Sequence, residues 1–248
     1  MDRNVLLAAL DDLLHPENYR DYAPNGLQVE GQRDIRHIVT GVSASLELIE
    51  KARLLGADTI LVHHGWFWKR DDPRITGVRR GRIAEILAAD MNLIAYHLPL
   101  DDHPTLGNNA LLGAALGFTP EGRFGEMNLG WIGDSGGCGT ARSLAMKIDS
   151  VLRRKPLLVG DGDRIVTRVA WCSGGGQDML EDAFEAGADC FISGEISERT
   201  TLIARELGIP YISSGHHATE RYGVRALGEH IHKTFGIDVT FVDIDNPV

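Results

Sequence analysis

Short apolar runs alternate with amphipathic stretches along most of the chain. The short runs are typical of buried strands, and the longer stretches repeat apolar residues at the spacing of a helix face. This alternation predicts an α/β fold with mostly parallel sheets. The expected strands are Ile38–Val42, Thr59–Val62, Asn92–Tyr96, Val166–Cys172, Cys190–Ser193, Tyr211–Ser213 and Val239–Val242. The expected helices are Ala44–Leu55, Arg79–Ala89, Asn108–Leu116, Thr140–Leu152, Asp178–Glu185, Glu198–Glu206 and Thr219–Thr234.

The chain also contains an internal echo. Val39–Gly65 and Val169–Glu195 both read as a strand, a small-residue turn, a helix ending in Gly-Ala-Asp, and a strand. We interpret them as two α/β units of related topology, the first over residues 1–125 and the second over residues 126–248, with the C-terminal strand able to return to the first. The alternative is two unrelated βαβ units that obey the same packing rules.

Composition and charge narrow the class of protein. The formal net charge is −10, and the longest basic run is Arg153-Arg154-Lys155. Nucleic acid is therefore disfavoured as a partner. The acidic N-terminus is unlike a signal peptide, and no stretch approaches the roughly 18 apolar residues of a membrane span. We expect a cytoplasmic protein with no membrane partner, whose three cysteines, without CxxC spacing, remain thiols.

Six of the ten histidines follow predicted strands: His63 and His64, His97 and His103, and His216 and His217. Ligands bind outside the carboxyl ends of strands in open α/β sheets, so three such strand ends predict one site. Successive strand residues face opposite sides, so His63 and His64 can share a site only if the chain turns there, which Gly65 permits.

The other two strand ends add carboxylates. Pro99 is expected to keep the segment after His97 out of a helix, which would let Asp101 reach across the strand tips. His97 and His103 are then candidate donors that orient ligands, and His97 is also a candidate for moving protons. For His103, the role of a turn residue before a proline is an equal alternative.

The third strand end leads into a helix. His216 and Glu220 are four residues apart, so one helical turn places them on the same face. His217 points elsewhere, and a substrate or proton-transfer role remains open for it.

The five candidate ligands are His63, His64, Asp101, His216 and Glu220. All are nitrogen or oxygen donors, which suit Zn²⁺, Mn²⁺, Fe²⁺, Ni²⁺ or Mg²⁺. Bridging carboxylates and water would complete the shells of two divalent ions per chain, as in two-metal hydrolytic sites. The predicted metal site lies between the two α/β units.

Seven stretches together resemble the dinuclear-metal-centre family of GTP cyclohydrolase 1 type 2 homologs, over almost the whole chain. They are YAPNGLQVEG, VTGVSAS, VHHGWFWK, HLPLDDHPTLGNNA, RVAWCSGGGQ, SGEISE and SGHHATERYGVRALGE. The resemblance implies the same five metal ligands, two α/β domains of related topology, and a toroidal homohexamer. The glycine-rich region Leu129–Gly139 matches no motif that we can place.

Three functions follow from these residues. The first is a metal-dependent hydrolase that uses a metal-activated water on an unidentified small molecule, with His97 or His217 moving protons. The second is a non-catalytic metal-binding or metal-handling protein, and the third is a toroidal scaffold. No P-loop is present. Ser173–Gln177 suits either an anion or close strand–helix packing. Glu195 and Glu198 either face the same cavity or are solvated or at an interface, and we expect the latter.

Overall fold

The structure, a computed structural model, describes residues 1–248 and divides into two compact units. Unit 1 comprises residues 1–106 and 223–245, and unit 2 comprises residues 107–222 and 246–248. From the sequence, we expected this division near residue 125. None of the helices combines the length and apolar character that crossing a bilayer requires.

Unit 1 is built on a five-stranded sheet with the order β1-β4-β3-β2-β11. Neighbours β11, β2, β3 and β4 are parallel, and β1 is antiparallel to β4. The carboxyl ends of β2, β3 and β4 therefore lie along one edge of the sheet. The strands are β1 (Gly26–Val29), β2 (His37–Ser43), β3 (Thr59–His64), β4 (Asn92–Ala95) and β11 (Asp238–Phe241).

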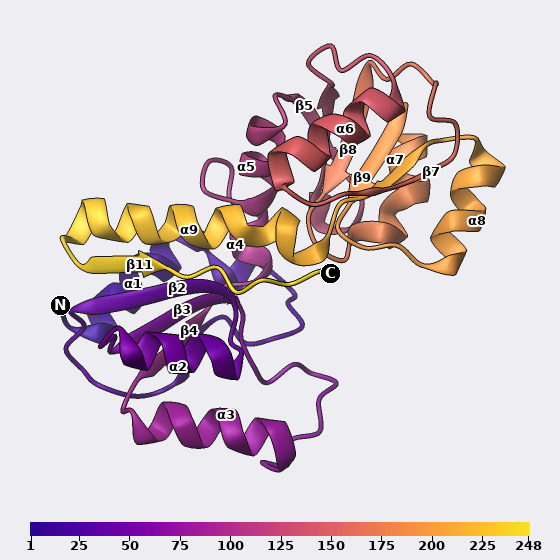
Figure 1. The fold of residues 1–248 in the computed structure, drawn as a ribbon. Helices are drawn as coiled ribbons and strands as arrows, with labels where there is room; N and C mark the ends of the chain where they lie inside the picture. The colour runs from indigo at the N-terminus through magenta and orange to yellow at the C-terminus, as the bar shows by residue number, and fades with distance from the viewer. The chain divides into compact units, whose positions relative to one another are not determined.

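Helices cover both faces of this sheet (Figure 1). On one face, α1 (Arg3–Leu14) and α9 (His216–Phe235) pack around Leu61, with Leu227 among the contacts. On the other, α2 (Leu46–Leu54) and α3 (Gly77–Ala88) pack around Ile60, with Leu48 among the contacts. Leu61 and Ile60 are neighbours on β3, and successive side chains of a strand point to opposite faces of the sheet. This strand therefore contributes side chains to both cores.

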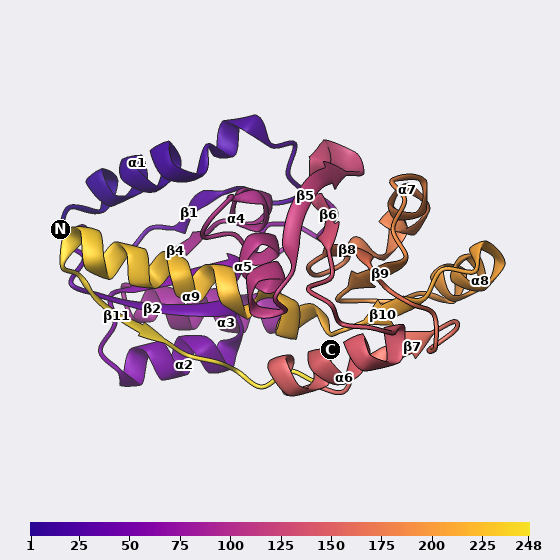
Figure 2. The same cartoon turned by 90° about the horizontal axis from the view of Figure 1, so that it is seen from above.

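Unit 2 is built on a six-stranded sheet with the order β5-β6-β8-β9-β10-β7. Its centre, β8-β9-β10, is parallel, and β5, β6 and β7 each run antiparallel to a neighbour. The strands are β5 (Thr119–Phe124), β6 (Gly130–Asp134), β7 (Leu157–Val159), β8 (Arg168–Cys172), β9 (Cys190–Ser193) and β10 (Tyr211–Ser213). The helices are α5 (Asn108–Ala115), α6 (Ala141–Leu152), α7 (Leu180–Glu185) and α8 (Glu198–Leu207), with α6 and α7 on opposite sides of the sheet (Figure 2).

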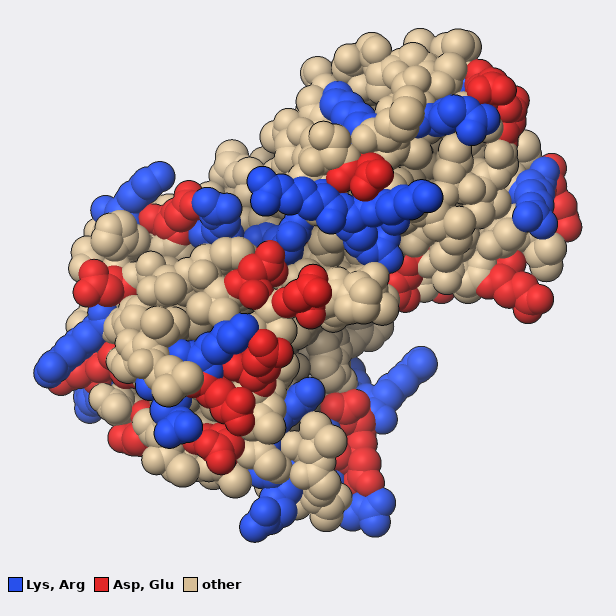
Figure 3. Space-filling model, in the orientation of Figure 1, with Lys and Arg blue, Asp and Glu red and all other residues tan.

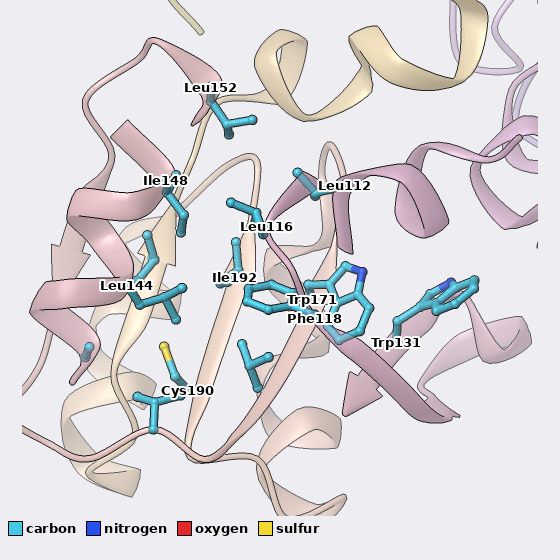
Figure 4. Close-up of a cluster of buried hydrophobic side chains, with 14 of the residues drawn as sticks. Leu112, Leu116, Phe118, Trp131, Leu144, Ile148, Leu152, Trp171, Cys190 and Ile192 are labelled. Carbon is cyan, nitrogen blue, oxygen red and sulfur yellow. The ribbon is translucent and has the colours of Figure 1, made fainter. Parts of the chain in front are cut away.

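One core of unit 2 surrounds Trp171 on β8 (Figure 4). Phe118 lies 5.2 Å from it between ring centroids, and its Nε1–H donates to Asn109 O at 2.9 Å. Leu112 of α5 packs in the same cluster. Residues 107–124 therefore belong to unit 2, because both α5 and the strand that follows it pack there. No disulfide links the three cysteines.

The two units share a common core topology. In each, a helix and an antiparallel edge strand precede three parallel strands: α1 and β1 before β2-β3-β4, and α6 and β7 before β8-β9-β10. Both edge strands pair with the last parallel strand, β1 with β4 and β7 with β10. The echo therefore reflects two units of related topology, as the first interpretation held.

The repeated Gly-Ala-Asp sequence has the same structural role in both units. Asp58 accepts hydrogen bonds from the backbone N–H groups of Arg36 and His37, where β2 begins. Asp189 likewise accepts from the backbone N–H groups of Thr167 and Arg168, where β8 begins. Each aspartate thus ties the start of the second parallel strand to the start of the first.

Two local expectations about the site were wrong. Pro99 does not exclude a helix, because it lies in the first turn of α4 (Leu98–Asp102). Backbone N–H groups of the first turn have no partner within a helix, so the missing N–H of proline costs nothing there. The chain also does not leave the strand before the histidine pair, because β3 continues to His64, which is paired with Ser43.

Candidate metal centre

His63 is the most enclosed of the candidate ligands. Its residue is fully buried at the end of β3, and its Nδ1 lies 3.0 Å from Tyr96 O. A carbonyl oxygen only accepts, so Nδ1 carries the proton and Nε2 presents its lone pair. This Nε2 lies 3.4 Å from Asp101 Oδ1. The imidazole is therefore in the tautomer that a metal ligand needs.

His64 lies beside His63 with 4.5 Å between ring centroids, although both belong to the strand. Its Nδ1 is 3.1 Å from Ser43 Oγ on the neighbouring strand β2. Nitrogen atoms of His63, His64 and His97 lie within 4.8 Å of one another. The strand end thus gathers three imidazoles, and Asp101 comes from the short helix that follows β4.

His97 is held by a carboxylate that the sequence analysis did not single out. Its Nδ1 is 2.6 Å from Asp21 Oδ1, and Asn25 Oδ1 accepts its backbone N–H. Burial raises the pKa of Asp21, but the hydrogen bond and charge of His97 and the Asn25 amide lower it to about 2. Asp21 therefore remains an anion and orients the ring. It lies directly before the motif that begins at Tyr22, and nothing in that motif signals its partner 76 residues away.

In unit 2, His216 and Glu220 lie one turn apart on α9, with His216 Nε2 3.1 Å from Glu220 Oε2. Glu195, which follows β9, places Oε1 2.7 Å from His216 Nδ1. Burial lowers the pKa of His216, but the hydrogen bonds and charges of Glu220 and Glu195 raise it to about 9. The surroundings of this imidazole therefore favour positive charge, which is the condition that a cation site requires. Glu195 therefore contacts a candidate ligand, as its cavity-facing alternative held, while its side chain remains 40% exposed.

Gly174 leaves the space that Glu220 occupies. A Cβ on this residue would lie 1.9 Å from Glu220 Oε1, and its φ is +59°. The backbone N–H of Gly174 donates to Thr219 Oγ1 on α9. Of the two roles left open for Ser173–Gln177, this contact supports close packing of the turn after β8 against the ligand helix.

The remaining histidines have different surroundings. His217 is buried, and its backbone N–H donates to Val248 O. His103 Nδ1 accepts the backbone N–H groups of Thr105 and Leu106, as a turn residue does. His103 therefore has the structural role of its two alternatives.

The donor set fits divalent ions in each unit taken by itself. Two ligands bound to one ion at about 2.0–2.2 Å lie about 3.0–3.5 Å apart, and the pairs His63–Asp101 and His216–Glu220 fall at 3.4 Å and 3.1 Å. Both imidazoles place Nδ1 on an oxygen and Nε2 toward the carboxylate, as in metal sites whose outer partners orient histidine. Nitrogen and oxygen donors without sulfur suit the first-row divalent ions and Mg²⁺.

Comparison with known proteins identifies relatives over the full length of the chain. Residues 1–247 match the family described as Duf34/NIF3 (NGG1p interacting factor 3). A GTP cyclohydrolase 1 type 2 homolog of Vibrio cholerae is 50% identical over 252 residues, covering 100% of both chains. The solved structure of the protein ybgI, described as of unknown function, is 48% identical with a TM-score of 0.97, and a Thermus thermophilus protein is 30% identical with a TM-score of 0.89. Each covers 100% of both chains. The chain belongs to the Duf34/NIF3 family.

Proposed function

We propose that this chain binds two divalent metal ions and acts as a metal-dependent hydrolase. His63, His64 and Asp101 of unit 1 and His216 and Glu220 of unit 2 are the proposed ligands. Together with water, these five side chains supply enough donors for two ions. The observation that carries it is the anchoring of Nδ1 in His63 and His216, which aims Nε2 at a carboxylate in each case.

Bound divalent ions supply an acidified water and stabilise negative charge on the substrate. The residues of the chain supply orientation and proton transfer. Asp21 keeps the proton of His97 on Nδ1, which leaves His97 Nε2 to accept a proton from a nucleophile and return it to a leaving group. His217 is the second proposed proton-transfer residue.

A non-catalytic metal-handling protein is the second candidate. Such a protein requires the metal ligands but does not require an oriented general base beside them. The His97–Asp21 pair, with its 2.6 Å hydrogen bond, therefore favours the hydrolase. A toroidal scaffold would need neither group.

The test is a substrate screen on the metal-loaded protein. The names of the relatives add GTP to a set of phosphate esters, amides and cyclic amidines. His97→Gln should lower turnover about 10²–10⁴-fold, the usual contribution of a general base, with metal content unchanged, and His64→Ala should abolish turnover and lower metal content. Turnover equal in wild type and His97→Gln would favour the metal-handling protein.

A further inference from the structure

The basic run Arg153-Arg154-Lys155 has no part in the metal centre. It follows α6 and leads into β7 in a chain whose formal net charge is −10. Figure 3 shows Lys and Arg side chains gathered over the end of α6 and the segment that follows it in the chain. A local concentration of positive charge in an acidic protein attracts anions to that place.

A cavity of about 620 Å³ lies beside this run, within unit 2. Arg154 and Lys155 line it together with Glu195, Ser213 and Val248, whereas Arg153 does not. The volume is in the range of small-molecule sites. Pro156, Leu157 and Ile196 add an apolar wall.

Arg154 is fixed in place at the rim of this cavity. Its Nε and Nη2 donate to Pro247 O at 3.1 and 3.0 Å, and its side chain lies against Gly215, where a Cβ would be 2.5 Å from Cδ. A guanidinium has further N–H donors beyond these two, in a rigid fork that matches phosphate. Lys155 is exposed and makes no ion pair.

Glu195 joins the cavity to the metal ligands. Glu195 lines the cavity, and its carboxylate oxygen Oε1 lies 2.7 Å from His216 Nδ1, so this acidic group already has an N–H partner. A ligand whose anion sits at Lys155 and Arg154 would extend past Glu195 toward His216 and Glu220.

We propose that this cavity binds a phosphate group of the substrate, with Arg154 and Lys155 as its cationic residues. That the phosphate group belongs to the substrate rests on the proposed function, whereas phosphate binding by this cavity does not. The substrate class is then a phosphorylated small molecule whose reacting part lies at the metal ligands.

Calorimetric titration with inorganic pyrophosphate tests this, on the metal-loaded protein and again after chelation, because phosphate also binds metals. Wild type should bind the probe in both states. Lys155→Gln and Arg154→Gln should each weaken binding to the metal-free protein about tenfold, the effect of one lost charge-assisted hydrogen bond. Arg153→Gln, which removes the same charge outside the cavity, should change it less than about twofold by the same reasoning.

Several results would overturn the site. They are no pyrophosphate binding by the metal-free wild type, equal weakening by Arg153→Gln and Lys155→Gln, or displacement of the probe by acetate at equal concentration. Metal content is measured in every variant and should match wild type. A failed substrate screen would therefore count against the hydrolase and leave the phosphate site standing.

Discussion

At the scale of single residues, the direction of each histidine ring is set by what its Nδ1 contacts. Tyr96 O orients His63, Asp21 orients His97, and Glu195 orients His216. Removing such partners usually costs a metal site 10–100-fold in affinity or activity. The candidate centre therefore depends on residues that hold no metal themselves.

A second residue-scale feature is Asp189, which holds the backbone where β8 begins. Burial raises its pKa, but hydrogen bonds from Arg168 and Thr167 lower it below the ordinary value. The carboxylate therefore stabilises the fold above its unfolded pKa of about 4, and this stabilisation is lost as pH falls through the lowered folded pKa. Asp189→Asn should lower the free energy of unfolding by about 1 kcal/mol at neutral pH.

Denaturant melts at pH 7 and pH 3 measure this. The difference between wild type and Asp189→Asn should shrink at the lower pH, because the wild-type carboxylate is then being protonated. A difference that is the same at both values would mean that the charge of Asp189 contributes nothing.

At this scale the ligand candidates were within reach of the sequence, but their orienting partners were not. His63, His64 and Asp101 stand out because donors at the ends of predicted strands share an edge. Asp21 and Glu195 come from other segments, 76 and 21 residues from the histidines that they hold. Only the fold brings such pairs together.

At the scale of elements, each ligand helix follows the last parallel strand of its unit: α4 follows β4 with Asp101, and α9 follows β10 with Glu220. The parallel strands β2, β3 and β4 of unit 1 and β8, β9 and β10 of unit 2 were predictable because they are buried apolar runs. The edge strands β1 and β7 were not, because they are short and only partly buried. Nor was β5, which contains Pro120 and Gly122.

The close approach of the turn after β8 to α9 can be tested at Gly174. Gly174→Ala should displace Glu220, because the new Cβ would lie 1.9 Å from its Oε1. We expect lower metal content as well as a loss of about 1–2 kcal/mol from the left-handed backbone.

Gly208→Ala is the matched control, because its φ is +67° and no atom lies within 4 Å of a Cβ there. It should lower the melting temperature by a similar route and leave metal content intact. Equal metal content in both variants, measured by elemental analysis, would show that Glu220 does not need the space at Gly174.

At the scale of the whole molecule, the resemblance implies a ring-like homo-oligomer, and unit 1 exposes several large apolar side chains. On α2 and α3, Leu54, Val78 and Leu87 are 80%, 71% and 56% exposed. We expect these exposed apolar side chains to contact other copies of the chain in such an oligomer.

Light scattering on wild type should give a mass several times 27.1 kDa. Val78→Asp with Leu87→Asp should lower it, and Leu202→Asp on α8, which is 51% exposed, should not. A monomeric mass for wild type across a wide concentration range would refute the assembly.

The account as a whole depends on the number of metal ions per chain, which elemental analysis of the purified protein measures directly. Wild type should carry close to two divalent ions. Asp101→Asn in unit 1 and Glu220→Gln in unit 2 should each lose at least one, because an amide oxygen is a poor ligand where a charged carboxylate balances two cations. Thermal melts check that both variants remain folded. One ion or none in wild type, or full occupancy in Glu220→Gln, would contradict the two-metal centre.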